Sequence, residues 1–455
     1  MITPLSLVVR TLFVLGFLVV GPIIYFFEFN KSLWIFFLVS VFIFIGLFFS
    51  ENKIYNKLSN LNSTPAFMIF VLLFFVVIVL GVIINYSSIG SAILSLRWYF
   101  FVWPIIFVFM LGGDGPKLVD RIWRFLLLVA ALQFPIVLFQ YFFVSLSSKR
   151  ASPWDAVVGT FPGAIDGGGQ SAAMGLFVIV MILAAYALWR AEKISANRFL
   201  IQAVCGVMTL AFAEVKAAVL LLPLLFVLYY GRDILRRPVE SGLPVLVALC
   251  LTVLLLSAYE PIHYDQIKKD RVTSIYTGIT AFKRVLGAVN PEKKRMDEND
   301  IGRVSHLILW GEQNLRSKDI LHALLGHGIG ATQASSIWPG EIAKLYPYRM
   351  DVSSSVILLW ETGIFGHLVF VLMLLYAARE SARLSRSDLI PDLHKIFLRV
   401  GYVALLLLII TLPYKNFVLR SVPTQLLLAL FLGQVLYWLG VLGGVSRNPK
   451  SLNQP

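Results

Sequence analysis

Long apolar stretches alternate with short polar connections along most of the chain. A membrane-crossing helix needs roughly 20 mostly apolar residues, and twelve stretches approach or meet that length. They cover residues 6–27, 33–50, 65–85, 92–112, 122–146, 170–189, 199–213, 216–230, 242–259, 352–376, 396–413 and 418–441. The pattern predicts an all-α polytopic membrane protein with about twelve transmembrane helices.

The least certain of these stretches are 199–213 and 216–230, which are separated only by Glu214 and Val215. They fit either a tight helical hairpin or one long tilted helix. With two crossings here and a cytoplasmic N-terminus, 19 Lys and Arg residues lie on cytoplasmic segments and 7 on the short outer loops. This bias has the sign that the positive-inside rule requires. It favours twelve crossings with both termini in the cytoplasm.

One connection is much longer than the others. Residues 260–351 contain 13 Lys and Arg and 11 Asp and Glu residues, and the charges of the flanking loops place this segment on the outer side. A connection of this length is usually functional, and we expect short helices in it. The chain then divides into helices 1–9 (1–259), the large loop (260–351), helices 10–12 (352–441) and a cytoplasmic tail (442–455).

Composition excludes a soluble protein. The 455 residues are 58% hydrophobic and 14% charged, whereas a soluble domain carries about 25% charged residues. The net charge of +14 would suggest nucleic-acid binding in a soluble protein, but here the topology rule explains it, and we expect no nucleic-acid partner. Both cysteines lie in apolar runs and no recognisable metal-ligand spacing occurs, so we expect no metal cofactor.

The large loop contains the first candidate site residues. Residues 301–315 have helical periodicity, which places Arg303, His306 and Trp310 on one stripe opposite an apolar face. The planar guanidinium of arginine suits phosphate, although a solvated arginine paired with a carboxylate has the same pattern. His306 fits a general base, a phosphate ligand or an ordinary loop histidine. Trp310 fits a sugar-stacking platform or an interface residue.

Three more charged residues lie near predicted helix ends. Lys216, between two apolar runs, fits an anion ligand or an interfacial ion pair with Glu214. Arg97 is a weaker anion-binding candidate, since an interfacial anchor beside Trp98 explains it equally well. Asp351 fits a general base or the N-cap of the helix that follows.

Two weaker glycan-binding candidates, Arg150 and Trp154, lie in the Pro- and Gly-rich loop 147–169. Surface charge and interfacial packing are the alternative explanations. Glu361 lies inside the predicted span 352–376, where a carboxylate must be paired or must shape a turn with Gly363. We favour a structural role for it.

This layout resembles that of the bacterial O-antigen polymerases and O-antigen ligases, which have about twelve crossings, cytoplasmic termini and one large periplasmic loop late in the chain. Four segments carry the resemblance: LAFAEVKAAVLLLP (210–223), Arg303 followed by Trp310, LLGHGIGA (324–331) and SSVILLWETGIFG (354–366) with its Glu-x-Gly-x-x-Gly ending. The central basic residue of the family is usually Arg and is Lys216 here. The His-Asn of many ligases is Val352-Ser353, which favours a polymerase-type relative.

The resemblance implies a glycosyltransferase of the bacterial inner membrane that acts in O-antigen or exopolysaccharide biosynthesis. Its donor is a glycan on undecaprenyl diphosphate, and its acceptor is a second glycan. Arg303, Lys216 and Arg97 bind the diphosphate and stabilise the departing charge, and Asp351 or His306 is the base, in an inverting, metal-independent transfer. A flippase and a chain-length regulator are the implied partners.

Two other functions remain possible from the sequence. A transporter, such as a flippase of lipid-linked saccharides, shares the helix count and the basic residues, but transporters usually show related halves and charges near the midplane. A structural membrane protein does not need the Arg303 stripe. The charged residues near the outer surface favour the enzyme.

Overall fold

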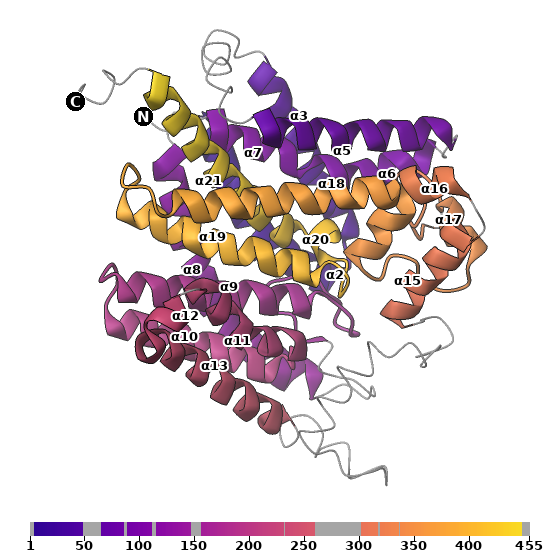
Figure 1. Cartoon of the computed structure of the whole chain (residues 1–455). Coiled ribbons are helices and arrows are strands. Elements are labelled where there is room, and N and C mark those ends of the chain that lie inside the picture. The colour runs from indigo at the N-terminus through magenta and orange to yellow at the C-terminus, as the bar shows by residue number, and fades with distance from the viewer. Residues whose placement is uncertain are drawn as a thin grey trace.

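The structure is a bundle of helices (Figure 1). The computed structural model describes residues 4–48, 65–85, 89–111, 115–146, 156–231, 233–259, 302–316, 319–335 and 337–447. These residues contain no β-strand, and their isolated β-bridge joins Gly163 to Gly169. The long helices run roughly side by side, with α15, α16 and α17 at one end of the bundle and the last turns of α21 at the other (Figure 1).

The first part of the chain, up to the large loop, forms helices that are interrupted by short irregular turns. They are α1 (Pro4–Val14), η1 (Leu15–Val19), α2 (Val20–Phe27), η2 (Asn30–Ser32), α3 (Leu33–Phe48), α5 (Pro65–Ile84), α6 (Ile89–Phe100), α7 (Val102–Leu111), α8 (Gly115–Phe139), η4 (Gln140–Ser145), α9 (Ser171–Arg190), α10 (Ala196–Phe212), α11 (Lys216–Tyr230), α12 (Asp233–Arg236) and α13 (Pro238–Tyr259).

The remainder contains four short helices and then three long ones, with the short helix α20 between the last two. They are α15 (Arg303–Gly311), η7 (Glu312–Arg316), α16 (Ile320–Leu325), α17 (Glu341–Leu345), α18 (Ser354–Leu384), α19 (Asp392–Thr411), α20 (Phe417–Arg420) and α21 (Val422–Arg447). The described part of the large loop, from 302 to 351, therefore contains the short helices that the sequence predicts. Residues 260–301 lie outside the described residues.

Among the residues that the structure describes, ten helices are long and apolar enough to cross a membrane, which makes this a multi-pass helical membrane protein. Two further apolar helices, α10 and α11, are shorter, with 17 and 15 residues. The chain breaks between them at Glu214, whose φ is +50°, and both helices pack against α9. The alternative of one long tilted helix is therefore wrong.

Two helices continue past the apolar stretches that the sequence predicts and into polar sequence. α8 begins at Gly115 rather than near residue 122, and an Asp120–Arg124 ion pair of 2.9 Å spans one turn of this extension. Such i,i+4 pairs stabilise exposed helical turns. Likewise, α21 continues to Arg447 into the predicted tail. Apolar content marks the part of a helix suited to lipid, and the helix itself extends past it.

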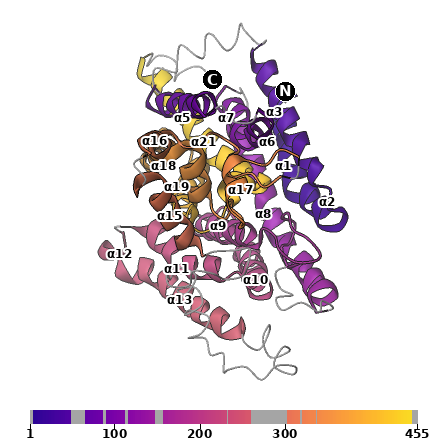
Figure 2. The ribbon, with the colours of Figure 1, turned by 90° about the vertical axis from the view of Figure 1, so that its right-hand side faces the viewer.

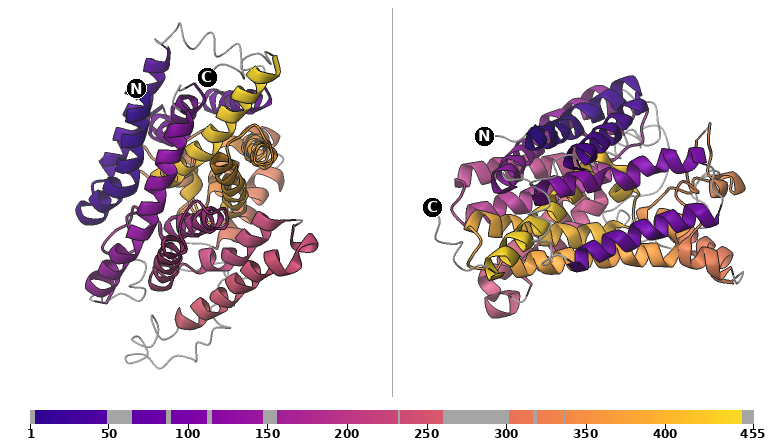
Figure 3. Two further views of the ribbon diagram at one scale, coloured as in Figure 1. Left: turned by 90° about the vertical axis from the view of Figure 1, so that its left-hand side faces the viewer. Right: turned by 90° about the horizontal axis from the view of Figure 1, so that it is seen from above.

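Helix α9 is the centre of the bundle. It contacts α8, α10, α11 and α19, and 89% of its most apolar window is buried, against 22% for α13 at the edge. Figures 2 and 3 show α13 on the outside of the bundle and α9 inside it. Because the first turn of α9 lies in this packed centre, the residues around it are held in place.

Candidate functional site

A cavity of about 370 Å³ lies where the first turn of α9 meets α15, the segment before α18 and the turn between α19 and α20. Four segments far apart in the sequence thus supply its walls. Its polar and charged side chains are Gln170, Arg303, Arg349, Asp351, Lys415 and Asn416. Three of these residues are cationic and one is anionic, so the net charge of the lining residues is positive.

Arg303 is the first residue of α15 and lines this cavity. Its guanidinium carbon lies 4.2 Å from the centroid of the Tyr414 ring. A stack of this kind attracts the cation to the ring face and holds the plane of the guanidinium. The hydrogen-bond donors at the edge of that plane stay free to turn toward an anion, which is the geometry that phosphate recognition uses.

Asp351 lines the same cavity, and its carboxylate accepts hydrogen bonds from Arg349 Nε at 3.3 Å and Nη2 at 3.2 Å. Its backbone carbonyl accepts from Asn416 Nδ2 at 2.7 Å. The alternative that Asp351 caps the next helix is wrong. Ser353 caps α18, since its Oγ accepts from the backbone N–H of Val356 at 3.3 Å. The Asp351 side chain is thus available for chemistry at the cavity.

His306 lies one turn after Arg303 and is fully buried. Burial lowers the pKa of His306 to about 4, although the nearby Asp351 carboxylate opposes this shift. The imidazole is therefore neutral at pH 7, and its low basicity makes it a weak general base. Between the two predicted bases, Asp351 is the one whose side chain lines the cavity.

Trp310 is 5% exposed and lies in a small core with Val356 and Trp360. Its indole Nε1 donates a hydrogen bond to the carbonyl of Leu359 at 3.0 Å. This contact lies one turn before the break in α18 at Gly363, where φ is +66°. The structure thus gives Trp310 a packing contact and a hydrogen bond, while its role in glycan binding stays a prediction.

The glycine-rich turn after α16 fits into the same break in α18. Gly326 has a φ of +73°, and a Cβ there would lie 2.5 Å from the backbone nitrogen of Thr362. The backbone nitrogen of His327 donates to the carbonyl of Trp360 at 2.7 Å. Two glycines, Gly326 and Gly363, therefore allow two backbones to touch. This contact gives a physical reason for glycine in both LLGHGIGA and the Glu-x-Gly segment.

Glu361 is fully buried beside this break. Its carboxylate accepts from Tyr99 Oη at 2.9 Å and from Thr332 Oγ1 at 2.5 Å, and it lies 3.6 Å from Arg420 Nη2. Arg420 also donates to the side-chain carbonyl of Gln333. We call Glu361, Tyr99, Thr332, Gln333 and Arg420 the Glu361 cluster. The expectation that Glu361 is paired is confirmed, and its structural role stays a prediction.

Arg420 was not among the predicted site residues. The signal for it resembles the one that singled out Lys216, because Arg420 is a basic residue inside the predicted apolar stretch 418–441. Its backbone carbonyl accepts from Gln170 Nε2 at 3.2 Å. Because Gln170 lines the cavity, α20 connects the cavity with the buried cluster.

Lys216 forms an ion pair of 2.7 Å with Glu214, and its side chain is 18% exposed. It begins α11, where the preceding Val215 packs close to Gly175 of α9. Lys216 is not among the residues that line the cavity. The structure therefore brings Arg303 together with Asp351 and His306, and it places Lys216 in the ion pair that the sequence left open.

Arg97 also lies away from the cavity lining. Its guanidinium carbon is 5.1 Å from the ring of Trp34 and 4.9 Å from that of Trp98. It is close enough to Arg420 for the two positive charges to repel. The remaining two predicted residues, Arg150 and Trp154, lie outside the described residues.

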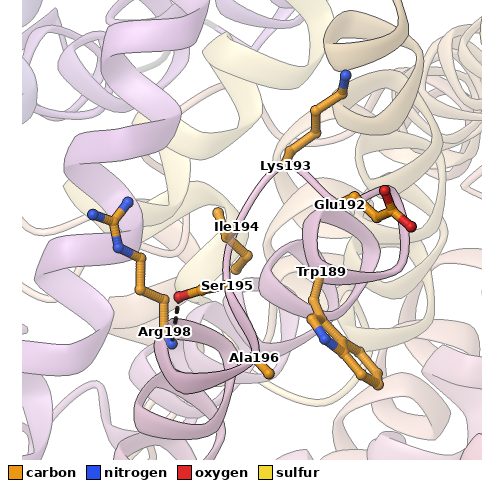
Figure 4. A pocket seen from close by; sticks show the side chains of 7 residues that line it. All are labelled: Trp189, Glu192, Lys193, Ile194, Ser195, Ala196 and Arg198. Carbon is orange, nitrogen blue, oxygen red and sulfur yellow. Dashed lines mark hydrogen bonds between the residues drawn. The ribbon is translucent and has the colours of Figure 1, made fainter.

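A second cavity, of about 420 Å³, lies at the turn between α9 and α10 (Figure 4). The charged ends of Glu192, Lys193 and Arg198 point in different directions there. None of the predicted site residues lines it. Within the part of the chain that the structure describes, no group of three His, Cys, Asp or Glu side chains is placed to hold a metal ion. The cavity near α15 is therefore the candidate site.

Comparison with known proteins identifies no family for this chain. No protein-family model matches the chain, and no curated protein matches its sequence. The functional argument therefore depends on the residues around the cavity.

Proposed function

We propose that this protein is an inner-membrane glycosyltransferase that polymerises or ligates oligosaccharide units carried on undecaprenyl diphosphate. The observation that carries the proposal is the cavity beside α15, where Arg303, Arg349 and Lys415 face one carboxylate, Asp351. A diphosphate is a doubly charged, oxygen-rich group, and an excess of cations over carboxylates suits it.

The cavity also has the position that a lipid-linked donor needs. It lies at the ends of long apolar helices, so a polyprenyl tail can remain among lipids while the diphosphate and sugar reach polar side chains. Arg303 begins α15, Arg349 lies in the segment before α18, and Lys415 lies in the turn before α20, so three segments bring their cations to the cavity. Fixed charges of this kind stabilise a leaving group without reorganising during the reaction.

The reaction follows from these positions. An acceptor hydroxyl attacks the anomeric carbon from the face opposite the diphosphate, and the C–O bond to the diphosphate breaks with its electron pair on the departing oxygen. Arg303, Arg349 and Lys415 stabilise that charge. Asp351 accepts the hydroxyl proton, and attack from the opposite face inverts the anomeric configuration.

The topology belongs to the same proposal. If α10 and α11 both cross, the chain has twelve crossings, and both termini lie in the cytoplasm with residues 260–351 in the periplasm. The separation of α15, α16 and α17 from the end of α21 supports this arrangement (Figure 1). Val352-Ser353, in place of a His-Asn pair, favours the polymerase over the ligase, with a flippase and a chain-length regulator as partners.

The test uses the purified full chain with undecaprenyl-diphosphate oligosaccharide and measures elongated product. We expect Arg303→Gln to lower the rate about 10²–10³-fold, the usual effect of removing one charge-stabilising donor. The matched control is Arg316→Gln, an exposed arginine of the same loop that does not line the cavity.

Two outcomes contradict the proposal. One is an unchanged product length distribution in Arg303→Gln. The other is translocation of the lipid-linked saccharide across proteoliposomes without elongation, which favours a transporter.

A further inference from the structure

A polar seam crosses the bundle where α6 faces the start of α21. Ser421 is the residue between α20 and α21, and Thr424 and Gln425 lie in the first turn of α21. Gln425 Nε2 donates to the carbonyl of Trp98 on α6 at 2.7 Å and joins the two helices. The seam comprises Ser95, Arg97, Trp98, Arg420, Ser421, Thr424 and Gln425.

The charges of the seam do not balance. Glu361 is the acidic partner of Arg420, at 3.6 Å. Arg97 has no ion pair within the described residues, and it contacts two indole rings and repels Arg420. Two guanidinium groups therefore share one carboxylate, which leaves about one positive charge among apolar helices. An ionised group in such surroundings is a functional hypothesis by default.

The seam also gathers hydrogen-bonding atoms that the protein does not satisfy. In native proteins a buried polar atom almost always has a partner, and an exception calls for a water, an ion or a ligand. Ser95, Ser421, Thr424 and Gln425 are each at most 1% exposed. Within the seam, seven buried atoms have no hydrogen-bond partner among the residues that the structure describes: Ser95 Oγ, Arg97 Nε, Trp98 Nε1, Arg420 Nη2, Ser421 Oγ, Thr424 Oγ1 and Gln425 Oε1.

We infer that the seam is a second anion site, which binds one phosphate group of a lipid. The donors without a hydrogen-bond partner among the described residues include Arg97 Nε and Trp98 Nε1, while Arg420 Nη2 lies 3.6 Å from Glu361. A lipid phosphate group that carries one negative charge offsets the one excess positive charge. Arg97 and Arg420 are the members that are not fully buried, and of these two Arg97 contacts Trp34 of the adjacent helix α3. A lipid headgroup therefore enters from the bilayer side, between α3 and α6.

This site is separate from the cavity beside α15. None of the seam residues lines that cavity. Binding at the seam requires no glycosyl transfer, so the inference can be tested independently of the proposed reaction. Arg97, which the sequence assigned to the donor diphosphate, here takes a different phosphate position together with Arg420.

The experiment measures binding to the purified full chain by native mass spectrometry. The probes, each titrated alone, are dioctanoyl phosphatidic acid, farnesyl diphosphate and inorganic phosphate, with dioctanoylglycerol as the uncharged control. The main variant is Arg97→Gln, because Arg97 has no carboxylate that would be left unpaired. Arg97→Lys retains the charge, Arg303→Gln alters only the cavity, and a thermal melt of each variant reports folding.

We expect a phosphate-bearing lipid to bind wild type at least tenfold more tightly than dioctanoylglycerol. Arg97→Gln should lose most of this preference, Arg97→Lys should recover part of it, and Arg303→Gln should retain it. Tighter binding of phosphatidic acid identifies a bilayer phospholipid, whereas tighter binding of farnesyl diphosphate identifies a prenyl-linked substrate.

Equal binding by wild type and a folded Arg97→Gln overturns the inference. Binding of inorganic phosphate without either lipid also overturns it, because the site would then be a phosphate site without a lipid. Equal retention of dioctanoylglycerol would show that the acyl chains alone account for binding.

Discussion

The cavity beside α15 and the Glu361 cluster both contact α20, but they use charge in opposite ways. Glu361 is fully buried, and its carboxylate contacts Tyr99, Thr332 and Arg420. In the cavity, Arg303 stacks on Tyr414 and Asp351 is bound by Arg349, whose side chain is 67% exposed. The first arrangement fixes the carboxylate completely, and the second leaves charged groups accessible.

This difference separates a structural charge from a functional one. A buried carboxylate surrounded by donors stabilises a single geometry, which here is the packing of the glycine-rich turn against α18. Removing either partner of its ion pair lowers the free energy of unfolding strongly. A half-exposed pair contributes little to stability but can exchange its partner for a substrate. Substitutions in the cluster should therefore affect folding, whereas substitutions in the cavity should affect turnover.

The largest expected effect is that of Glu361→Ala. It leaves Arg420 buried without its carboxylate, and breaking such a pair typically costs about 3–5 kcal/mol. We expect a marked drop in melting temperature in detergent. Glu312→Ala, at an exposed position of the same loop, is the control. An unchanged melt for Glu361→Ala would mean that the cluster does not hold the loop.

Gly363→Ala should have the second largest effect. The residue has a φ of +66°, and an added Cβ would lie 2.3 Å from the carbonyl oxygen of Leu324. Such backbone strain costs about 1–3 kcal/mol, and the clash adds to it. Gly311→Ala is the matched control, since a Cβ there meets nothing within 4 Å. Limited proteolysis of the loop should be faster in Gly363→Ala only, and equal rates would contradict the contact.

Sequence patterns predicted the helices much better than the contacts between them. Apolar length located the long helices, and the stripe of Arg303 and His306 pointed to the cavity wall. Arg420 was missed because its importance depends on Glu361, which lies about sixty residues earlier and meets it only after folding. For Trp310 the sequence leaves sugar stacking and interfacial packing both open, since its spacing cannot show that its indole donates to the carbonyl of Leu359.

On the cavity side, Tyr414→Leu should lower turnover about tenfold with little change in stability. The ring holds the Arg303 guanidinium at 4.2 Å, and a cation–π contact is worth about 0.5–2 kcal/mol. Tyr414→Phe keeps the ring and should keep most of the activity. Elongation of the lipid-linked oligosaccharide measures both variants. Loss of activity in Tyr414→Phe equal to that in Tyr414→Leu would show that the hydroxyl, rather than the stack, matters.

The smallest expected effect is a loss of loop stability in acid. Because burial lowers the pKa of His306 to about 4, the unfolded loop binds more protons than the folded one between about pH 4 and 6.5. Stability is therefore complete above the unfolded pKa and falls as the pH drops through this window, by on the order of 1 kcal/mol at pH 5. Hydrogen exchange of residues 303–311, corrected for intrinsic rates, should be faster at pH 5 than at pH 7. His306→Phe should remove that difference between pH 5 and pH 7. The opposite result, stronger protection of the loop in acid, would show that the folded loop contains the charged imidazole, bound by Asp351.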